Sequence, residues 1–323
     1  MKYCKSILVM LLAFFSLTTV QTIHAATNNV QKVIDETYVQ PDYVLGYSLS
    51  ADQRNQTLSI LGYQENSAAK LKTLNTTAYA QIMNVADDPS LQLYSSVKIK
   101  KLGARETLAV TILTPENIIK VTPDMYRNAA ITLGIQHAHI SVASPIPVTG
   151  ESALAGIYYS LEENGASIPV ESKALAQEEL AALSDINAAN TGKAGYDADK
   201  LNVALTDIKA AVAKEGRNIS EEQVREVVDK TLDHYGLSDA VTADQINLIV
   251  NFAINLSNSK VIFNGDFIKT LDSLKDSIVS KAGSTFKGID LHFDANQALE
   301  KGQSLWHQLM DALRGFIDEL KGN

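Results

Sequence analysis

Three consecutive residues could bind an anion at the start of a predicted helix. Gly150, Glu151 and Ser152 follow a strand-like segment and a proline-containing loop. Unpaired backbone N–H groups at such a helix start can hold a small anion or a carboxylate. Glu151, however, places a negative charge where that anion would lie. The alternative interpretation is an ordinary helix start, in which Ala153 and Ala155 allow close packing.

The same segment can be compared with the turn that carries a nucleophilic serine. A nucleophile elbow has glycine two residues before and two residues after the serine. Gly150 satisfies the first position around Ser152, but Leu154 occupies the second. His137 or His139 could act as a base, yet the sequence offers no third member of a triad. The pattern therefore does not predict a serine hydrolase.

Two other patterns resemble metal sites but complete none. His137 and His139 would share one face of a strand, but a zinc site needs three or four ligands and the other histidines lack motif spacing. A calcium loop starting at Asp185 would need glycine at its sixth position and glutamate at its twelfth. Asn190 and Tyr196 stand there instead. We therefore predict no metal and no cofactor.

A regular apolar stripe near the C-terminus is the clearest pattern in the chain. Its members follow one another at spacings of three and four, as on one face of a helix. Such a stripe packs on the protein's own helices or docks a partner. We favour internal packing, because long apolar faces are seldom left in water. The stripe comprises Trp306, Leu309, Leu313, Phe316 and Leu320.

The N-terminal residues have the three parts of a secretory signal peptide. Lys2 and Lys5 precede an apolar run over 7–20, and Ala25 supplies a small residue at the cleavage position. The run is short for a membrane span. The sequence therefore predicts export and cleavage before Ala26, with an uncleaved N-terminal anchor as the alternative. We expect the mature protein to be secreted, either free outside the cell or associated with the cell wall.

Charge and cysteine content narrow the function classes. The chain has 28 basic and 37 acidic residues, and the signal carries two of the basic ones, so the mature net charge is 26 − 37 = −11. Nucleic-acid binding needs a basic surface, so this acidity argues against it. The single cysteine, Cys4, lies in the signal, which leaves a mature chain without thiols or disulfides. No later stretch is long enough to predict a transmembrane anchor.

Hydrophobic periodicity predicts a signal peptide over 1–25, a lead-in over 26–41, an α+β domain over 42–165 and an all-helical region over 166–323. We expect a mostly antiparallel sheet, because strand and helix patterns alternate irregularly and two adjacent strand patterns resemble a hairpin. The predicted strands cover 43–49, 71–74, 97–99, 108–112 and 138–143, with the hairpin formed by 97–99 and 108–112. The predicted N-terminal helices cover 51–61, 76–83, 123–134 and 150–164, and their caps are Ser50, Asn75, Thr122 and Thr149. Beyond Gly165 we expect helices at about 170–188, 197–214, 220–235, 242–256, 260–282 and 294–320, with capping boxes at Ser220–Gln223 and Thr242–Gln245.

The region from Val44 to about Thr191 resembles the YpuA-like family of secreted Gram-positive proteins, which is known only as a domain of unknown function. The resemblance implies secretion but no activity, substrate or catalytic residue. The resemblance rests on five sequence motifs that occur in the order typical of the family: Leu49–Arg54, Tyr94–Val97, Asn117–Tyr126, Ala143–Gly150 and Ala153–Tyr158.

Taken together, these patterns favour a non-catalytic binding protein that acts outside the cell or at its envelope. No complete catalytic motif is present, so whether the protein is an enzyme stays open. The alternative is an extracellular hydrolase that acts on cell-wall polymer or peptide, with a catalytic pair assembled from residues distant in sequence. A third class is a purely structural role through the C-terminal stripe. The expected partner is an extracellular or envelope component, and the sequence leaves the oligomeric state open.

Overall fold

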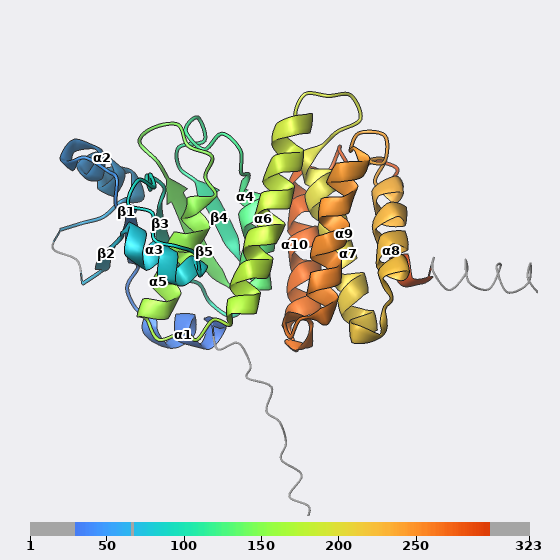
Figure 1. The fold of residues 1–323 in the computed structure, drawn as a ribbon, viewed down its shortest axis with the longest axis horizontal. Helices are drawn as coiled ribbons and strands as arrows, with labels where there is room; N and C mark the ends of the chain where they lie inside the picture. Colours follow the sequence, from blue (N-terminus) through green and yellow to red (C-terminus); the bar gives the residue numbers. More distant parts are fainter. Residues whose placement is uncertain (1–29, 66–67, 298–323) are drawn as a thin grey trace, which may run out of the picture.

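The computed structural model describes residues 30–65 and 68–297. A five-stranded sheet with its covering helices forms one half, and a bundle of longer helices forms the other (Figure 1). Among the described residues, no helix has both the length and the apolar character needed to cross a membrane. The general order, a sheet-bearing half followed by helices, agrees with the sequence prediction.

The sheet is mixed, so the prediction of a mostly antiparallel sheet is wrong. Its strand order is β2-β1-β3-β5-β4. β1 pairs with β2 in parallel and with β3 antiparallel, while β5 pairs with β3 antiparallel and with β4 in parallel. The five strands are β1 (Asp42–Gly46), β2 (Lys70–Leu74), β3 (Ser96–Lys101), β4 (Ala109–Ile112) and β5 (Ala138–Ala143).

The predicted hairpin between 97–99 and 108–112 is also wrong. β5 lies between these two strands and pairs with both. Five of the six β5 residues are buried, as expected for a strand with neighbours on both sides, whereas the edge strand β4 leaves Thr111 exposed. Sequence adjacency suggested the hairpin, but the buried apolar run of β5 takes an interior position between β3 and β4.

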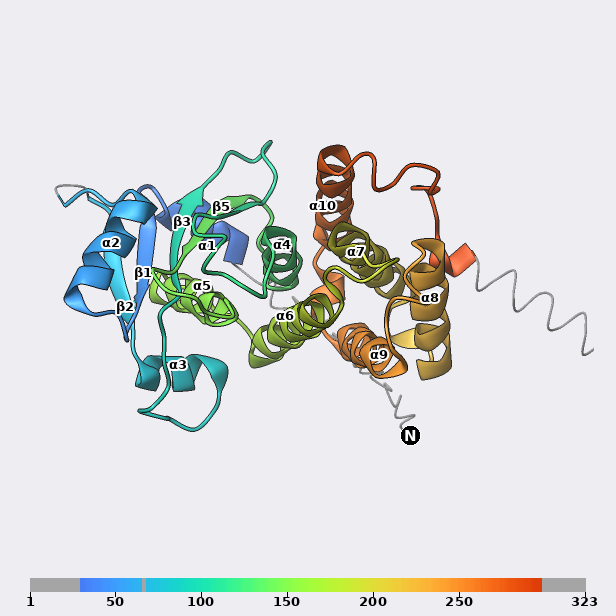
Figure 2. The same ribbon diagram turned by 90° about the horizontal axis from the view of Figure 1, so that it is seen from above.

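Helices cover both faces of this sheet (Figure 2). On one face, α5 (Ser152–Glu163) packs against β1 and β3. Gly156 allows this approach, because a Cβ atom there would lie 3.2 Å from Val97 Cγ2. On the other face, α2 (Ala51–Leu61) covers a smaller apolar cluster that includes Tyr43 and Leu45. The alternation of side chains along β1 thus supplies both cores.

Local signals set the ends of several helices as predicted. Ser50 and Gln53 form a capping box at the start of α2, and Gly62 ends that helix in the left-handed conformation. Asn75 caps α3 (Thr76–Met83). Thr122 caps α4 (Pro123–Thr132), which starts with a proline that needs no hydrogen bond there.

The cap predicted at Thr149 is wrong. Glu151 occupies the N-cap position of α5, in a helical conformation and without a side-chain capping bond. Gly150 adopts a φ of +97°, and its carbonyl accepts the first turn's bond from the Ala153 amide. The helix therefore starts two residues later than the sequence pattern indicated.

The predicted lead-in contains a helix. In α1 (Val30–Thr37), Val30, Val33 and Ile34 are buried in the main core. Its apolar positions recur at helical spacing, but the segment is only two turns long. Short helices of this kind are stabilised by packing rather than by intrinsic propensity.

The second half contains five long helices within the described residues. They are α6 (Val170–Asn190), α7 (Ala198–Glu215), α8 (Glu221–His234), α9 (Ala243–Asn258) and α10 (Phe267–Lys281), with short 3₁₀ turns at η1 (Gly216–Asn218) and η2 (Val261–Phe263). The helical stretch predicted over 260–282 divides into η2 and α10. One apolar core runs from Val30 to Ala295 and crosses Gly165. The division into two domains at that glycine stays a prediction.

Helix α4 joins the two halves. It contacts β4 on one side and α6 and α10 on the other, and Figure 2 shows it between the sheet and the helical bundle. Residues Asp124 to Thr132 are all buried, although several are polar. Two of these polar groups serve a fully buried ion pair between Lys209 Nζ and Glu179 Oε1, 2.6 Å apart. Lys209 also donates to the Asn128 carbonyl, and the Thr132 hydroxyl donates to Glu179.

Candidate functional site

The turn predicted to bind an anion is fixed by close contacts on its inner side. A Cβ atom at Gly150 would lie 2.6 Å from Ile118 Cγ2 and 2.8 Å from the Tyr126 hydroxyl, so only glycine fits there. The Tyr126 hydroxyl donates to the Gly150 carbonyl. Burial raises the pKa of Tyr126, with a smaller contribution from Glu151, so this donor stays protonated.

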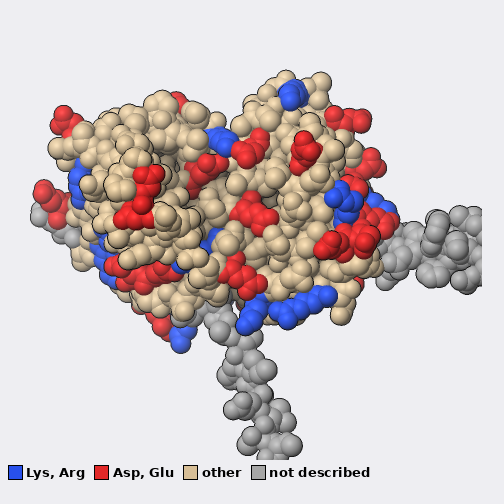
Figure 3. Space-filling view, in the orientation of Figure 1, with Lys and Arg blue, Asp and Glu red and all other residues tan. Residues whose placement is uncertain are grey.

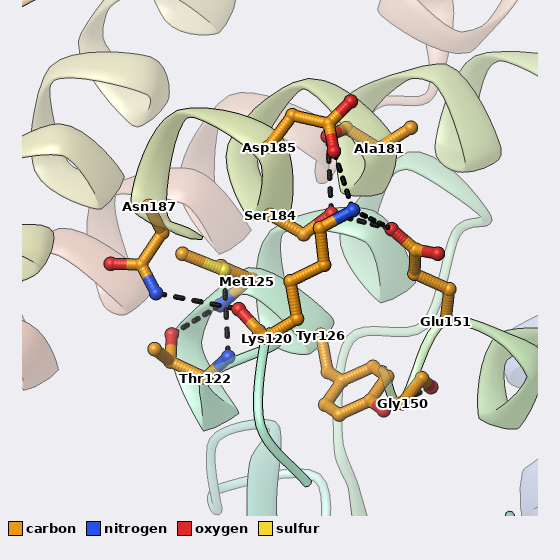
Figure 4. A network of polar contacts seen from close by, with 10 residues as sticks. All are labelled: Lys120, Thr122, Met125, Tyr126, Gly150, Glu151, Ala181, Ser184, Asp185 and Asn187. Carbon is orange, nitrogen blue, oxygen red and sulfur yellow. Dashed lines mark hydrogen bonds and ion pairs between the residues drawn. The ribbon is translucent and has the colours of Figure 1, made fainter. Parts of the chain in front are cut away.

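The carboxylate of Glu151 has partners within the chain (Figure 4). Its Oε1 lies 3.0 Å from Lys120 Nζ and accepts a hydrogen bond of 2.8 Å from the Ser184 hydroxyl. Lys120 also pairs with Asp185, and this bond is the main cause of the raised pKa of Lys120. We call Lys120, Glu151, Ser184 and Asp185 the α6 junction, because they attach α6 to the turn before α5.

The backbone around the α6 junction joins three segments that are distant in sequence. Val148 pairs in parallel with Ile118, and Asn187 of α6 donates to the Lys120 carbonyl at 3.3 Å. Two of the sequence motifs that the family shares, 117–126 and 143–150, are therefore in contact at this junction. The prediction that Gly150, Glu151 and Ser152 bind an anion stays a prediction. At this turn the nearest acidic group is the chain's own Glu151, already paired with Lys120.

The residues considered for catalysis and metal binding are not brought together. His137 Nε2 lies 3.0 Å from Asp35 Oδ1, and His139 Nε2 lies 2.9 Å from the Thr111 hydroxyl, so neither ring is bonded to Ser152. Within residues 30–65 and 68–297, no group of three or more metal-ligating side chains gathers. The C-terminal stripe, from Trp306 to Leu320, lies outside the described residues, and its packing stays a prediction.

A cleft of about 490 Å³ opens on the other side of α4. Its walls are the loop of residues 104–108 after β3, one face of α4, the segment 136–137 and one face of α10. In Figure 2 this loop and α10 lie on the same side of α4. Leu108, Ile131 and Leu274 contribute buried apolar surface. We call this space the α10 cleft; its volume is in the range of small-ligand sites.

Arg127 is the main polar feature of the α10 cleft. Its side chain is only 3% exposed. Nε donates to the Leu108 carbonyl at 2.9 Å, and Nη1 donates to Asp124 Oδ1 at 2.8 Å. Nη2 has no hydrogen-bond partner among the described residues, although the side chain lines the cleft. A buried guanidinium is thus held in place with donors left over for a bound group.

The charges around the α10 cleft differ from those of the chain as a whole. Arg105, Arg127 and Lys269 line it together with the two acids Glu106 and Asp266, giving 3 − 2 = +1. The whole chain carries −9, and on the face drawn in Figure 3 acidic side chains spread over both halves. Asp124, which pairs with Arg127, brings this sum to zero, so the cleft is nearly neutral while the chain as a whole is acidic, and it is more tolerant of an anionic ligand than the average charge implies.

Helix α1 positions a histidine at the edge of the α10 cleft. Gln31 accepts hydrogen bonds from the Gln136 and His137 amides and donates to Asp35. Asp35 in turn contacts the His137 ring, which lines the cleft. The predicted lead-in over 26–41 contained no helix, so the sequence did not predict this group. The Gln31–Asp35 spacing of four residues on a short amphipathic segment was the available signal.

These features define a protein with a mixed sheet, a helical bundle packed on it and, between α4 and α10, a cleft that contains a buried arginine. Comparison with known families identifies the chain more closely. It belongs to the family described as "Protein of unknown function (DUF1002)", whose sequence pattern matches residues 45–274. The match extends from β1 into α10, beyond the region of the sequence resemblance, and includes every residue that lines the α10 cleft.

One relative is the uncharacterized protein YpuA of Bacillus subtilis (strain 168). It is 28% identical to this chain over 185 residues, which make up 57% of this chain and 59% of that protein. The aligned region thus spans less than two thirds of the relative's length. No solved structure matches the chain.

Proposed function

We propose that the mature protein is a secreted or envelope-associated binding protein and that the α10 cleft is its ligand site. Export is supported by the charged, apolar and small-residue parts of the first 25 residues. The acidic composition argues against nucleic acid as the partner.

The single observation that carries the proposal is the incomplete hydrogen bonding of the buried Arg127 side chain. A side chain that is 3% exposed and cationic pays a desolvation cost, which its bonds to Asp124 and Leu108 offset only in part. Arg127 lines the α10 cleft, and its remaining donors have no acceptor among the described residues. An arrangement of this kind suits a ligand that supplies the missing acceptor.

Ligand-observed NMR tests the proposal with extracts of the producing cell's envelope and culture medium. Components that receive saturation from the wild-type mature chain should lose it in Ser273→Trp, which fills the cleft from α10. The matched control is Ser280→Trp, because Ser280 lies two turns further along the same helix and does not line the cleft. Equal signals from the two variants would mean that ligands bind elsewhere.

Cellular location needs its own test. Mass spectrometry of the culture medium and the washed envelope should find a mature chain that begins at or near Ala26. A full-length chain retained in the membrane would contradict export by a cleaved signal.

An extracellular hydrolase is the second candidate, and one observation favours it. Asp35 contacts Nε2 of His137 at the edge of the α10 cleft, as a carboxylate does when it orients a general base. The two functions separate in His137→Gln. If the protein only binds, neither the wild-type chain nor the variant should convert the extract components, and both should bind them. If it is a hydrolase, the wild-type chain should convert them, and the variant should bind them without conversion.

A further inference from the structure

We propose that the α10 cleft recognises a monocarboxylate carried on a short apolar body, and that Arg127 Nη2 donates to that carboxylate. This inference rests on the proposed function, because it assigns a ligand class to the same cleft. A peptide C-terminus and a short-chain fatty acid share this chemistry.

The hydrogen bonds of Arg127 define the recognising group. A guanidinium has five N–H donors, and the protein uses one on Nε and one on Nη1. The other three, including both on Nη2, have no partner among the described residues. Asp124 and Leu108 hold the group in one orientation, so little side-chain entropy is lost when a ligand binds.

The local charge balance favours one negative charge over two. The two positive charges of Arg105 and Lys269 equal in number the two negative charges of Glu106 and Asp266. Asp124 already offsets part of the charge of Arg127. A carboxylate adds one negative charge to this nearly balanced group. A phosphate adds close to two, so the repulsion from Glu106 and Asp266 would be larger than for a carboxylate.

The rest of the cleft indicates what the carboxylate is attached to. Leu108, Ile131 and Leu274 offer apolar surface for a short aliphatic group. The hydroxyls of Thr270 and Ser273 donate to carbonyls of their own helix, at Asp266 and Lys269, so their oxygens remain free to accept. Acceptors at this place suit the amide N–H of a peptide.

A matched set of small probes tests the proposal by NMR on the ¹⁵N-labelled mature chain. N-acetylleucine should shift the Arg127 Nε–H signal and the amides of 104–108 and 266–274. N-acetylleucinamide replaces the carboxylate with a neutral amide and should bind about tenfold more weakly or worse, because the charge-assisted bond is lost. Hexanoate separates the two sources: a peptide site binds it more weakly than N-acetylleucine, and a fatty-acid site binds it more tightly.

Variants connect the effect to Arg127. Arg127→Lys keeps the charge but removes the Nη2 donors, and should weaken N-acetylleucine binding about tenfold. If this variant does not fold, the surface pair Arg105→Gln/Lys269→Gln serves instead and should weaken binding about threefold, whereas Lys260→Gln/Lys287→Gln, away from the cleft, should have no effect.

Three results would overturn the inference. Equal binding of N-acetylleucine and its amide would leave the cleft as a ligand site without carboxylate recognition. Tighter binding of inorganic phosphate than of N-acetylleucine would reverse the charge argument. No shift of cleft signals by any probe would remove the carboxylate assignment, while the extract experiment with Ser273→Trp still decides the proposed function by itself.

Discussion

Helix α6 takes part in two ionic contacts that differ in their exposure to water: one joins it to α7, and the other joins it to the sheet-bearing half. The Lys209–Glu179 pair is 0% exposed on both sides, whereas the side chains of Lys120, Glu151 and Asp185 in the α6 junction are 23%, 28% and 55% exposed. The buried pair must keep both members, since a single charge left there would be desolvated without compensation. The α6 junction is screened by water, so each of its members matters less. Ion pairs between similar side chains therefore contribute differently to the stability of the fold.

The α10 cleft adds a third case. Arg127 is nearly as buried as Lys209, but the protein satisfies only part of its donors. Lys209 Nζ donates to Glu179 and to the Asn128 carbonyl, and we expect it to have a structural role. Arg127 Nη2 has no acceptor among the described residues and belongs to a side chain that lines a cleft, so we expect Arg127 to have a binding role.

The largest expected effect is that of Lys209→Met. It leaves the Glu179 carboxylate buried without its cation, and should lower the free energy of unfolding by about 3–5 kcal/mol. Urea denaturation followed by circular dichroism measures this. The control is Lys209→Met/Glu179→Leu, which removes both charges and should recover most of the loss. A double variant less stable than the single one would contradict the assignment of the loss to an unpaired charge.

Gly150→Ala should come second. The new Cβ would meet Ile118 and Tyr126 at less than 3 Å, in addition to the strain of a φ of +97°. We expect a loss of about 2–4 kcal/mol. Gly165→Ala is the matched control, because its φ is +96° but nothing lies within 4 Å of the added atom. It should cost about 1–2 kcal/mol, so the difference between the variants measures the contact at the turn.

Lys120→Ala should have a smaller effect, despite its two acidic partners. Because the α6 junction is partly exposed, we expect a loss of about 1 kcal/mol or less, decreasing as salt is added. Denaturation at low and high sodium chloride measures it. The effect of Lys209→Met should change little with salt. If salt changed the stability loss of both variants by the same amount, the difference in exposure would not explain why one loss is larger than the other.

The smallest effect concerns a histidine on the sheet. Burial, then Lys100 and Lys98, lower the pKa of His139 below its ordinary value of 6.5. The unfolded chain then binds a proton more readily than the folded one, so stability falls as pH drops below about 6.5 and levels off below the folded-state pKa. His139→Gln should remove this part of the pH dependence. Urea denaturation at neutral and mildly acidic pH compares the two proteins, and identical curves would exclude a contribution from His139.

Local sequence signals predicted much of the secondary structure. The capping boxes at Ser220–Gln223 and Thr242–Gln245 start α8 and α9 as expected. Each signal depends on residues within one turn of helix, so the sequence states it directly. The prediction failed at the Thr149 cap, where the Tyr126 hydroxyl and the packing around Gly150 fix the turn instead. That competing contact comes from a residue 24 positions away.

The sequence by itself determined the acidic charge, the cysteine content outside the first residues, the sites of most helices and the family resemblance. Tertiary structure alone decided that β5 lies between β3 and β4, that Lys209 meets Glu179, and that Arg127 lines a cleft with α10. The physical reason is the distance along the chain between the residues that interact. Caps and periodicity act between neighbours in the chain, whereas strand order and the α10 cleft depend on which distant apolar surfaces are buried together. The residues around Arg127 come from four separate segments, and no spacing in the sequence connects them.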